Sequence, residues 1–199
     1  MSLEPLSLDH VDGLTHAADE DRSTYGFTAI PPDFERMRGY VEGLLEDQRT
    51  GVVVPFSQVD LATNSIVGMT RYLTIRCRPG DSTPFAVEIG GTWLAASAQR
   101  SGINTEAKFL LLQHAFDVWG VARVDLKTDS RNERSRAAIA RLGATLEGVL
   151  RHWQPSQVVG EENHYRDTAM YSIVDSQWPS ISSQLRAVIS FYGGQPAQP

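Results

Sequence analysis

The polar stretch from Gln99 to Ala107 constrains the fold of this chain more than any other segment. An extended segment, residues 85–94, precedes it, and an apolar run, residues 108–119, follows it. The density of apolar residues in that run predicts a helix that packs on more than one side. A strand, a glycine-bearing loop and a helix in this order present free backbone N–H groups to an anion such as a phosphate.

Three residues of this stretch have expected roles at the start of the helix. Gly102 can adopt a positive φ, which would let a diphosphate approach the backbone. Asn104 is expected to cap the helix, and Glu106 suits its positive end. The stretch contains neither GxGxxG nor GxxxxGK[ST], and a glycine-bearing turn before a helix is by itself a weak indicator of phosphate binding.

A second patterned segment follows the next predicted strand, which covers residues 121–128. Asn132 and Ser135 lie three residues apart and therefore share one face of a helix, which is expected to end at Gly143. The succession of the two segments resembles the GCN5-related N-acetyltransferase (GNAT) superfamily, and within it the branch of ribosomal-protein N-terminal acetyltransferases (RimJ/RimL-like). In that branch a (Q/R)xxGxx loop with TEA opens one helix, and an NxxS segment ending in LG forms the next.

The resemblance implies an α/β (α+β) fold of GNAT type. Its central sheet would be mixed and mostly antiparallel, splayed at its middle strands and flanked by helices. One domain is expected over residues 1–179, followed by an amphipathic helix over residues 180–192 and a disordered tail over residues 193–199. Helical spacing puts four residues on the apolar face of that helix: Ile181, Leu185, Val188 and Ile189. The pair Gly90-Gly91 suggests a bulge in its strand, and by the resemblance the pantetheine arm of the cofactor lies along that strand's edge.

Periodicity and capping signals predict the remaining elements. The predicted strands cover residues 3–6, 52–60, 66–76, 146–153 and 168–174, and the predicted helices cover residues 9–18 and the segment that runs from a cap at Asp33 to about Arg49.

The composition narrows the expected partners. The net charge of −6 and the pI near 5.3 argue against nucleic acid, because Lys and Arg drive phosphate binding, and they fit a cationic amine. Cys77 is the only cysteine, which excludes an intrachain disulfide and a cysteine-based metal site. The sequence shows no signal peptide and no membrane-length apolar run, so a cytoplasmic protein without a membrane partner is expected. A homodimer stays open.

The resemblance implies acetyl-CoA as the cofactor. The cofactor-binding residues that it implies are Trp93, Leu94, Gln99, Arg100, Ser101, Gly102, Ile103, Asn104, Thr105, Asn132 and Ser135. Backbone amides from Arg100 to Thr105 would hold the diphosphate, and Asn132 would hydrogen-bond the pantetheine. A structural alternative stays open, in which Asn132 only caps its helix and Ser135 is an exposed helical serine.

Acetyl transfer requires a positioned acceptor, a polarised carbonyl and a donor for the departing thiolate. By the resemblance, Ser135 would be that donor. Glu88, on the strand that enters the splay, is the first candidate for the general base, and Glu147 and His152 are the next. The reaction needs no metal, and the sequence offers no convincing set of metal ligands.

In this superfamily the first two helices and their connection form one wall of the acceptor site. Here that wall would contain Asp19, Glu20, Asp21, Tyr25 and Phe27. An acidic rim at this place would attract a cationic amine. The alternative is a solvated turn anchored by its two aromatic residues.

These expectations describe an acetyl-CoA-dependent N-acetyltransferase that acts by direct transfer to a primary amine in a ternary complex. An N-terminal α-amine of a protein or peptide is the leading acceptor by family likeness, and a small amine such as an aminoglycoside is the alternative. Two non-enzyme alternatives are a GNAT-like module that binds CoA as a sensor and an unrelated phosphate-binding domain. The last of these explains the first loop only.

Overall fold

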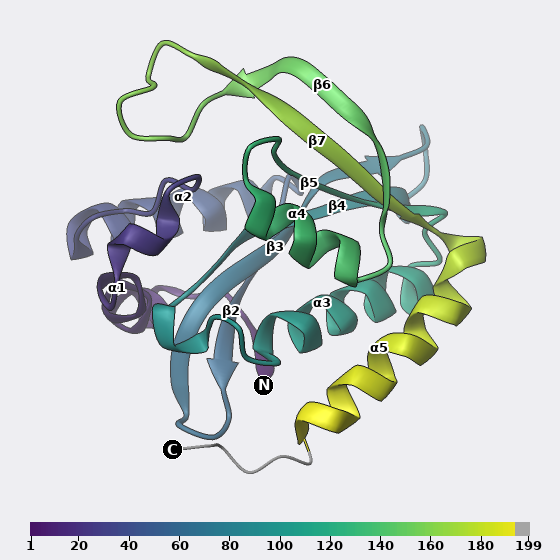
Figure 1. Ribbon diagram of the computed structural model, residues 1–199, viewed down its shortest axis with the longest axis horizontal. Coiled ribbons are helices and arrows are strands. Elements are labelled where there is room, and N and C mark those ends of the chain that lie inside the picture. Colours follow the sequence, from purple (N-terminus) through teal and green to yellow (C-terminus); the bar gives the residue numbers. More distant parts are fainter. Residues whose placement is uncertain (194–199) are drawn as a thin grey trace.

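The computed structural model describes residues 1–193, which form one open sheet of seven strands with helices on both faces (Figure 1). The strand order is β1-β2-β3-β4-β5-β7-β6, and β4–β5 is the parallel pair in an otherwise antiparallel sheet. This confirms the mixed, mostly antiparallel sheet. The strands are β1 (Ser2–Pro5), β2 (Val54–Asp60), β3 (Ser65–Cys77), β4 (Pro84–Leu94), β5 (Arg123–Asp129), β6 (Thr145–Pro155) and β7 (Tyr165–Val174).

Each face of the sheet has its own hydrophobic core. Helices α1 (Val11–Asp19) and α2 (Phe34–Arg49) cover one face, where they bury Met69 and Trp93. Helices α3 (Ile103–Gln113), α4 (Glu133–Arg141) and α5 (Trp178–Gly193) cover the other face, where they bury Val87 and Leu126. Side chains alternate between the faces of a strand, so β3 and β4 contribute to both cores.

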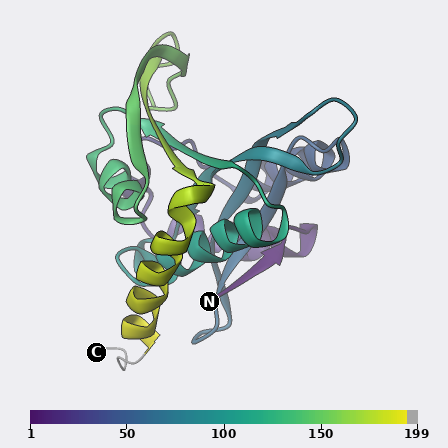
Figure 2. The same ribbon diagram turned by 90° about the vertical axis from the view of Figure 1, so that its right-hand side faces the viewer.

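The sheet splays between β4 and β5. These strands pair only from Ala86 to Glu88 on β4, although β4 continues to Leu94. A bulge lies directly beyond the last pair: Arg71 of β3 faces Gly90, whereas Met69 faces Trp93. Turned by 90°, the fold shows the β6–β7 hairpin projecting away from the rest of the sheet (Figure 2). The predicted splay and the predicted bulge are both confirmed.

Local signals predicted several element ends correctly. The Asp33 side chain caps α2 by accepting a hydrogen bond from the Arg36 N–H at 2.9 Å. Gly143 follows α4 with a φ of 88°, the left-handed conformation that ends many helices.

The C-terminal helix is longer than predicted and packs into the core beside α3. Ile181 and Leu185 are buried, but Val188, predicted on the apolar face, is 42% exposed. Most of the predicted tail, residues 194–199, lies outside the described residues. No helix in the described range 1–193 is both long and apolar enough to cross a bilayer.

Candidate active site

Glu88 lies at the mouth of the splay, at the last residue pair between β4 and β5. It is only 4% exposed, and its carboxylate accepts hydrogen bonds from Lys127 Nζ at 2.9 Å and Thr74 Oγ1 at 3.1 Å. A carboxylate this deeply buried requires such partners. The sequence placed Glu88 correctly at the entrance to the splay but missed its ion pair with Lys127.

Glu147, the second candidate for the general base, is held in an ion pair that argues against this role. Its two carboxylate oxygens accept hydrogen bonds from the two terminal nitrogens of Arg123, each at 2.7 Å, and one also accepts from Ser172 Oγ at 2.5 Å. The hydrogen bonds from Arg123 and then from Ser172 lower the pKa of Glu147 to about 2. A general base works best with a pKa near the operating pH.

His152 lies in an irregular part of β6. It has a φ of 49°, and its backbone N–H donates to Asp167 Oδ1 at 2.9 Å. It lines a cavity of about 290 Å³ together with His164 and Arg166, and neither Glu88 nor Glu147 belongs to that lining. A role for His152 as the general base stays a prediction.

The loop before α3 has a different geometry from the predicted one. Gly102 occupies the N-cap position with a φ of −72°, and the positive φ belongs to Arg100 at 61°. Asn104 does not cap the helix, because it lies within the first turn, and its buried Oδ1 has no hydrogen-bond partner among the described residues. Glu106 is in the first turn, as predicted.

Gln99 connects this loop to two other segments. Its Nε2 donates to the Leu94 carbonyl at 2.9 Å and to Thr24 Oγ1 at 3.1 Å. Arg134 of α4 donates to Gln99 Oε1 at 3.0 Å and to the Thr24 carbonyl at 2.7 Å. Arg134 thus joins the start of α4 to the α3 loop and the α1–α2 connection. The sequence analysis did not single out Arg134.

The α1–α2 connection packs against the end of β4. The Tyr25 hydroxyl donates to the Leu94 carbonyl at 3.1 Å, and its ring meets that of Trp93 edge to face. Burial raises the pKa of Tyr25, which keeps this hydroxyl protonated. Phe27 lies under the guanidinium of Arg131, with 5.6 Å between Cζ and the ring centroid.

Asp19, the last residue of α1, and Asp21 of the connection form local contacts. Asp21 Oδ1 accepts the Ser23 N–H at 3.0 Å and caps a short 3-10 helix, and Asp19 pairs with Arg22 at 3.1 Å. Both carboxylates are exposed, so water can solvate them and the structure does not require a bound ligand beside them. Their role in attracting an amine stays a prediction.

The start of α4 places Asn132 and Ser135 together. Asn132 Oδ1 accepts the Ser135 N–H at 3.0 Å and so caps the helix. The cap belongs to the structural alternative of the sequence analysis, but Ser135 is half-buried and not exposed. Within residues 1–193 the Asn132 amide nitrogen and the Ser135 hydroxyl make no further hydrogen bond, so their proposed roles toward the cofactor stay predictions. Trp93 and Leu94 point into the α1–α2 core, so any cofactor contact from them would come from their backbone.

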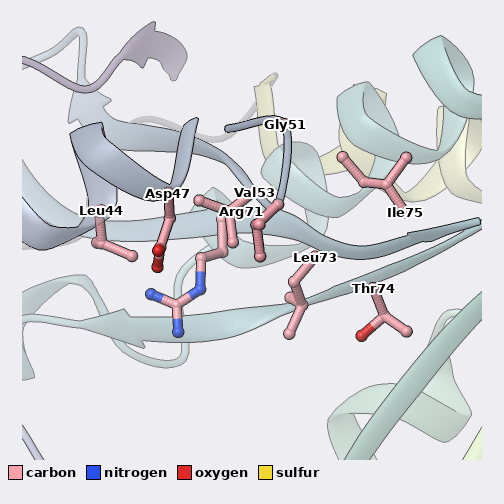
Figure 3. Close-up of a pocket in the computed structure, with 9 residues that line it drawn as sticks. Leu44, Asp47, Gly51, Val53, Arg71, Leu73, Thr74 and Ile75 are labelled. Carbon is pink, nitrogen blue, oxygen red and sulfur yellow. The ribbon is translucent and has the colours of Figure 1, made fainter. Parts of the chain in front are cut away.

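Arg71 and a cavity of about 440 Å³ lie on the α2 face of the sheet (Figure 3). Arg71 donates from Nη1 to the Tyr40 hydroxyl at 2.8 Å. A Cβ on Gly91 would come within 2.7 Å of Arg71 Cζ, so the guanidinium lies directly against the bulge. Gly91 also has a φ of 57°, a left-handed conformation that favours glycine at this position.

Lys108 is a buried lysine that the sequence analysis missed. It extends from α3 to β3 and β4, where Nζ donates to Thr70 Oγ1 at 3.0 Å and to Thr92 Oγ1. It is 5% exposed and has no acidic partner within ion-pair distance in residues 1–193. Burial lowers its pKa to about 7.

We expect Lys108→Met to remove a pH dependence of stability. The folded protein releases the Lys108 proton near pH 7, whereas an unfolded lysine keeps it to about pH 10.4. Between these values the unfolded chain binds more protons, so wild-type stability should rise with pH by up to about 1.4 kcal/mol per pH unit. Urea unfolding of both proteins across this range measures the two slopes, and equal slopes would contradict the expectation.

Three features of the described chain define a class of protein. The parallel strands β4 and β5 separate, a bulge lies at their point of separation, and a helix N-terminus follows the free end of β4. This is the architecture of an acyltransferase that uses an acyl-CoA. No group of three or more potential metal ligands occurs within residues 1–193.

Comparison with known proteins identifies the family. The model of the acetyltransferase (GNAT) domain matches residues 1–145. A GCN5-related N-acetyltransferase from Brucella melitensis is 29% identical, with a TM-score of 0.79 over 94% of this chain and 81% of that chain. A proposed acetyltransferase from T. thermophilus is 33% identical, with a TM-score of 0.76 over 94% and 92% of the two chains. RimJ of Mycobacterium smegmatis, solved in complex with CoA-disulfide, shares the fold at 22% identity and a TM-score of 0.77, over 94% and 88%. No curated protein sequence matches the chain significantly.

The chain therefore belongs to the GNAT family and is an N-acetyltransferase that uses acetyl-CoA. The resemblance inferred from its two patterned segments is confirmed, together with the enzyme class and the cofactor. The two non-enzyme alternatives are not retained.

Proposed function

We propose that the acceptor is the N-terminal α-amine of a protein or peptide. The supporting observation is the state of the carboxylates near the splay. Glu88 is ion-paired with Lys127, and Arg123 and Ser172 hold the pKa of Glu147 at about 2. Carboxylates held in this way are weak bases, so they suit an amine that is already partly neutral. An α-amine, with a pKa of about 7.7–8.0, is partly neutral near pH 7, whereas a lysine amine, with a pKa near 10.4, needs a stronger base.

The site fits acetyl-CoA at two places. Beyond Glu88, the β4 edge that faces β5 has backbone groups without a β5 partner, which suits the pantetheine arm. The first turn of α3 has N–H groups that the helix itself does not use, and exposed Arg100 lies just before it, which suits the diphosphate. When bound, acetyl-CoA supplies an activated acetyl group.

The chain's own residues would then position the amine and move its proton. Glu88 would accept the proton directly or through one water, with Lys127 and Thr74 fixing its carboxylate. The Ser135 hydroxyl would donate a hydrogen bond at the site of the departing sulfur. Asn132 would keep Ser135 in place by capping α4.

We expect acetylation of a peptide with a free α-amine and no lysine. A matched peptide with a blocked N-terminus and one lysine should react at least about 10-fold more slowly at neutral pH, because a smaller fraction of its amine is neutral. Thiol release gives the rates, and mass spectrometry locates the acetyl group. Equal rates for the two peptides, or reaction with small amines only, would contradict the α-amine proposal.

A further inference from the structure

The cavity on the α2 face lies between the C-terminal half of α2, the segment before β2 and the end of β3 (Figure 3). Its volume of about 440 Å³ lies within the range of small-ligand pockets. Its walls are mainly apolar and are formed by Leu44, Val52, Val53, Leu73 and Ile75. Two charged residues, Asp47 and Arg71, also line it.

Arg71 has N–H donors that the structure does not use within the described residues. A guanidinium carries five N–H donors, and the hydrogen bond to Tyr40 uses one of them. Its Nε is buried and has no acceptor among the residues that the structure describes. Because this Nε lies against Gly91, the donors left for a ligand oxygen are the Nη N–H groups that the hydrogen bond to Tyr40 does not use.

The cavity adjoins the mouth of the splay. Arg71 lies against Gly91, and Leu73 Cδ2 lies 3.1 Å from the position that a Cβ on Gly90 would take. Glu88 Oε1 lies 3.2 Å from the same position. The wall of the cavity, the Arg71 guanidinium and the candidate base therefore meet at the bulge of β4.

We propose that this cavity selects the acceptor by the two groups attached to the carbon that bears the amine. Arg71 binds the carbonyl oxygen on that carbon, and the apolar walls enclose an aliphatic side chain. Asp47 on the same lining disfavours a second negative charge, so an uncharged amide carbonyl fits better than a free carboxylate. The selected class is a peptide or amide whose first residue is aliphatic. This inference rests on the proposed function and narrows its substrate class.

Three amines of related structure test the proposal. Leucinamide carries both groups, 3-methylbutylamine lacks the carbonyl, and glycinamide lacks the side chain. With rates normalised to the concentration of neutral amine, we expect kcat/KM for leucinamide to exceed each of the others about 10-fold or more.

Arg71→Gln should abolish the preference of the enzyme for leucinamide over 3-methylbutylamine, and Arg71→Lys should restore it in part, because lysine lacks the planar fork. Arg78→Gln is the matched control, since Arg78 is an exposed arginine beyond the end of the same strand and should leave the preference unchanged. Tyr40→Phe is a second variant in case Arg71→Gln does not fold. It should raise KM for leucinamide and leave KM for 3-methylbutylamine unchanged.

The outcomes separate this inference from the proposed function. Acetylation of all three amines without preference, or a preference that survives Arg71→Gln in a folded protein, overturns the Arg71 assignment and leaves α-amine acetylation intact. Acetylation of none of the amines, including free-α-amine peptides, overturns both. A leucinamide preference that disappears only in the Arg71 and Tyr40 variants supports the inference.

Discussion

Replacing Gly102 by glutamate is expected to weaken acetyl-CoA binding about 100-fold while the protein stays folded. Gly102 is the N-cap residue of α3 and has a φ of −72°, which any residue can adopt. A carboxylate there would stand where the free N–H groups of the first turn suit a diphosphate. Two like charges about 4 Å apart at a protein surface repel by about 4 kcal/mol, before screening by solvent and salt reduces that value.

Gly102→Gln is the matched control, because it adds the same volume without the charge. Isothermal titration with acetyl-CoA should give a Kd for Gly102→Gln much closer to wild type than to Gly102→Glu. The loss in the glutamate variant should shrink as salt is added, since salt screens the repulsion. An unchanged Kd for folded Gly102→Glu would show that the diphosphate binds elsewhere.

Local signals predicted many of the elements and their ends, whereas the resemblance to the GNAT superfamily predicted how the strands assemble into the sheet. Periodicity located the strands, Asp33 and Gly143 marked helix ends, and the Gly90-Gly91 pair marked the bulge. The prediction that Asn104 caps α3 was wrong, because the helix begins one residue earlier, at Ile103, with Gly102 as its N-cap. Sequence alone does not fix which of several neighbouring residues is the first in a helix. Val188 failed because helical spacing does not show where a helix leaves the core.

The site was harder to predict because its chemistry depends on contacts between distant segments. Glu147 and Glu88 are both acidic residues on strands. Only the fold shows that Glu147 forms an ion pair with Arg123 and that Glu88 forms one with Lys127. Lys108 looked like an ordinary helical lysine until the structure placed it against Thr70. Local patterns locate a backbone-based cofactor site, but they do not show which side chains meet across the sheet.

Glu88→Gln is expected to lower kcat about 100-fold or more, which is the lower range for loss of a general base. Glutamine keeps the size of the side chain and one acceptor oxygen toward Lys127 and Thr74, but it cannot accept the amine proton. Glu147→Gln is the control, because a carboxyl with a pKa of about 2 takes no part in proton transfer near neutrality. It should leave kcat within about threefold of wild type, since it alters a partly exposed ion pair with Arg123 and keeps an oxygen that can accept the hydrogen bond from Ser172.

The Glu88 variant also breaks a buried ion pair, so its effect on folding has to be separated from its effect on chemistry. Removing one partner of such a pair can cost about 3–5 kcal/mol of stability, whereas removing both charges costs less. The double variant Glu88→Gln with Lys127→Met should therefore regain stability in urea unfolding but not regain kcat. Acetyl-CoA affinity should stay close to wild type in both, because Glu88 faces the α2 side of β4 and not the α3 loop. If the double variant is stable, binds acetyl-CoA and turns over at the wild-type rate, Glu88 is a structural residue and the acceptor reaches the site already neutral.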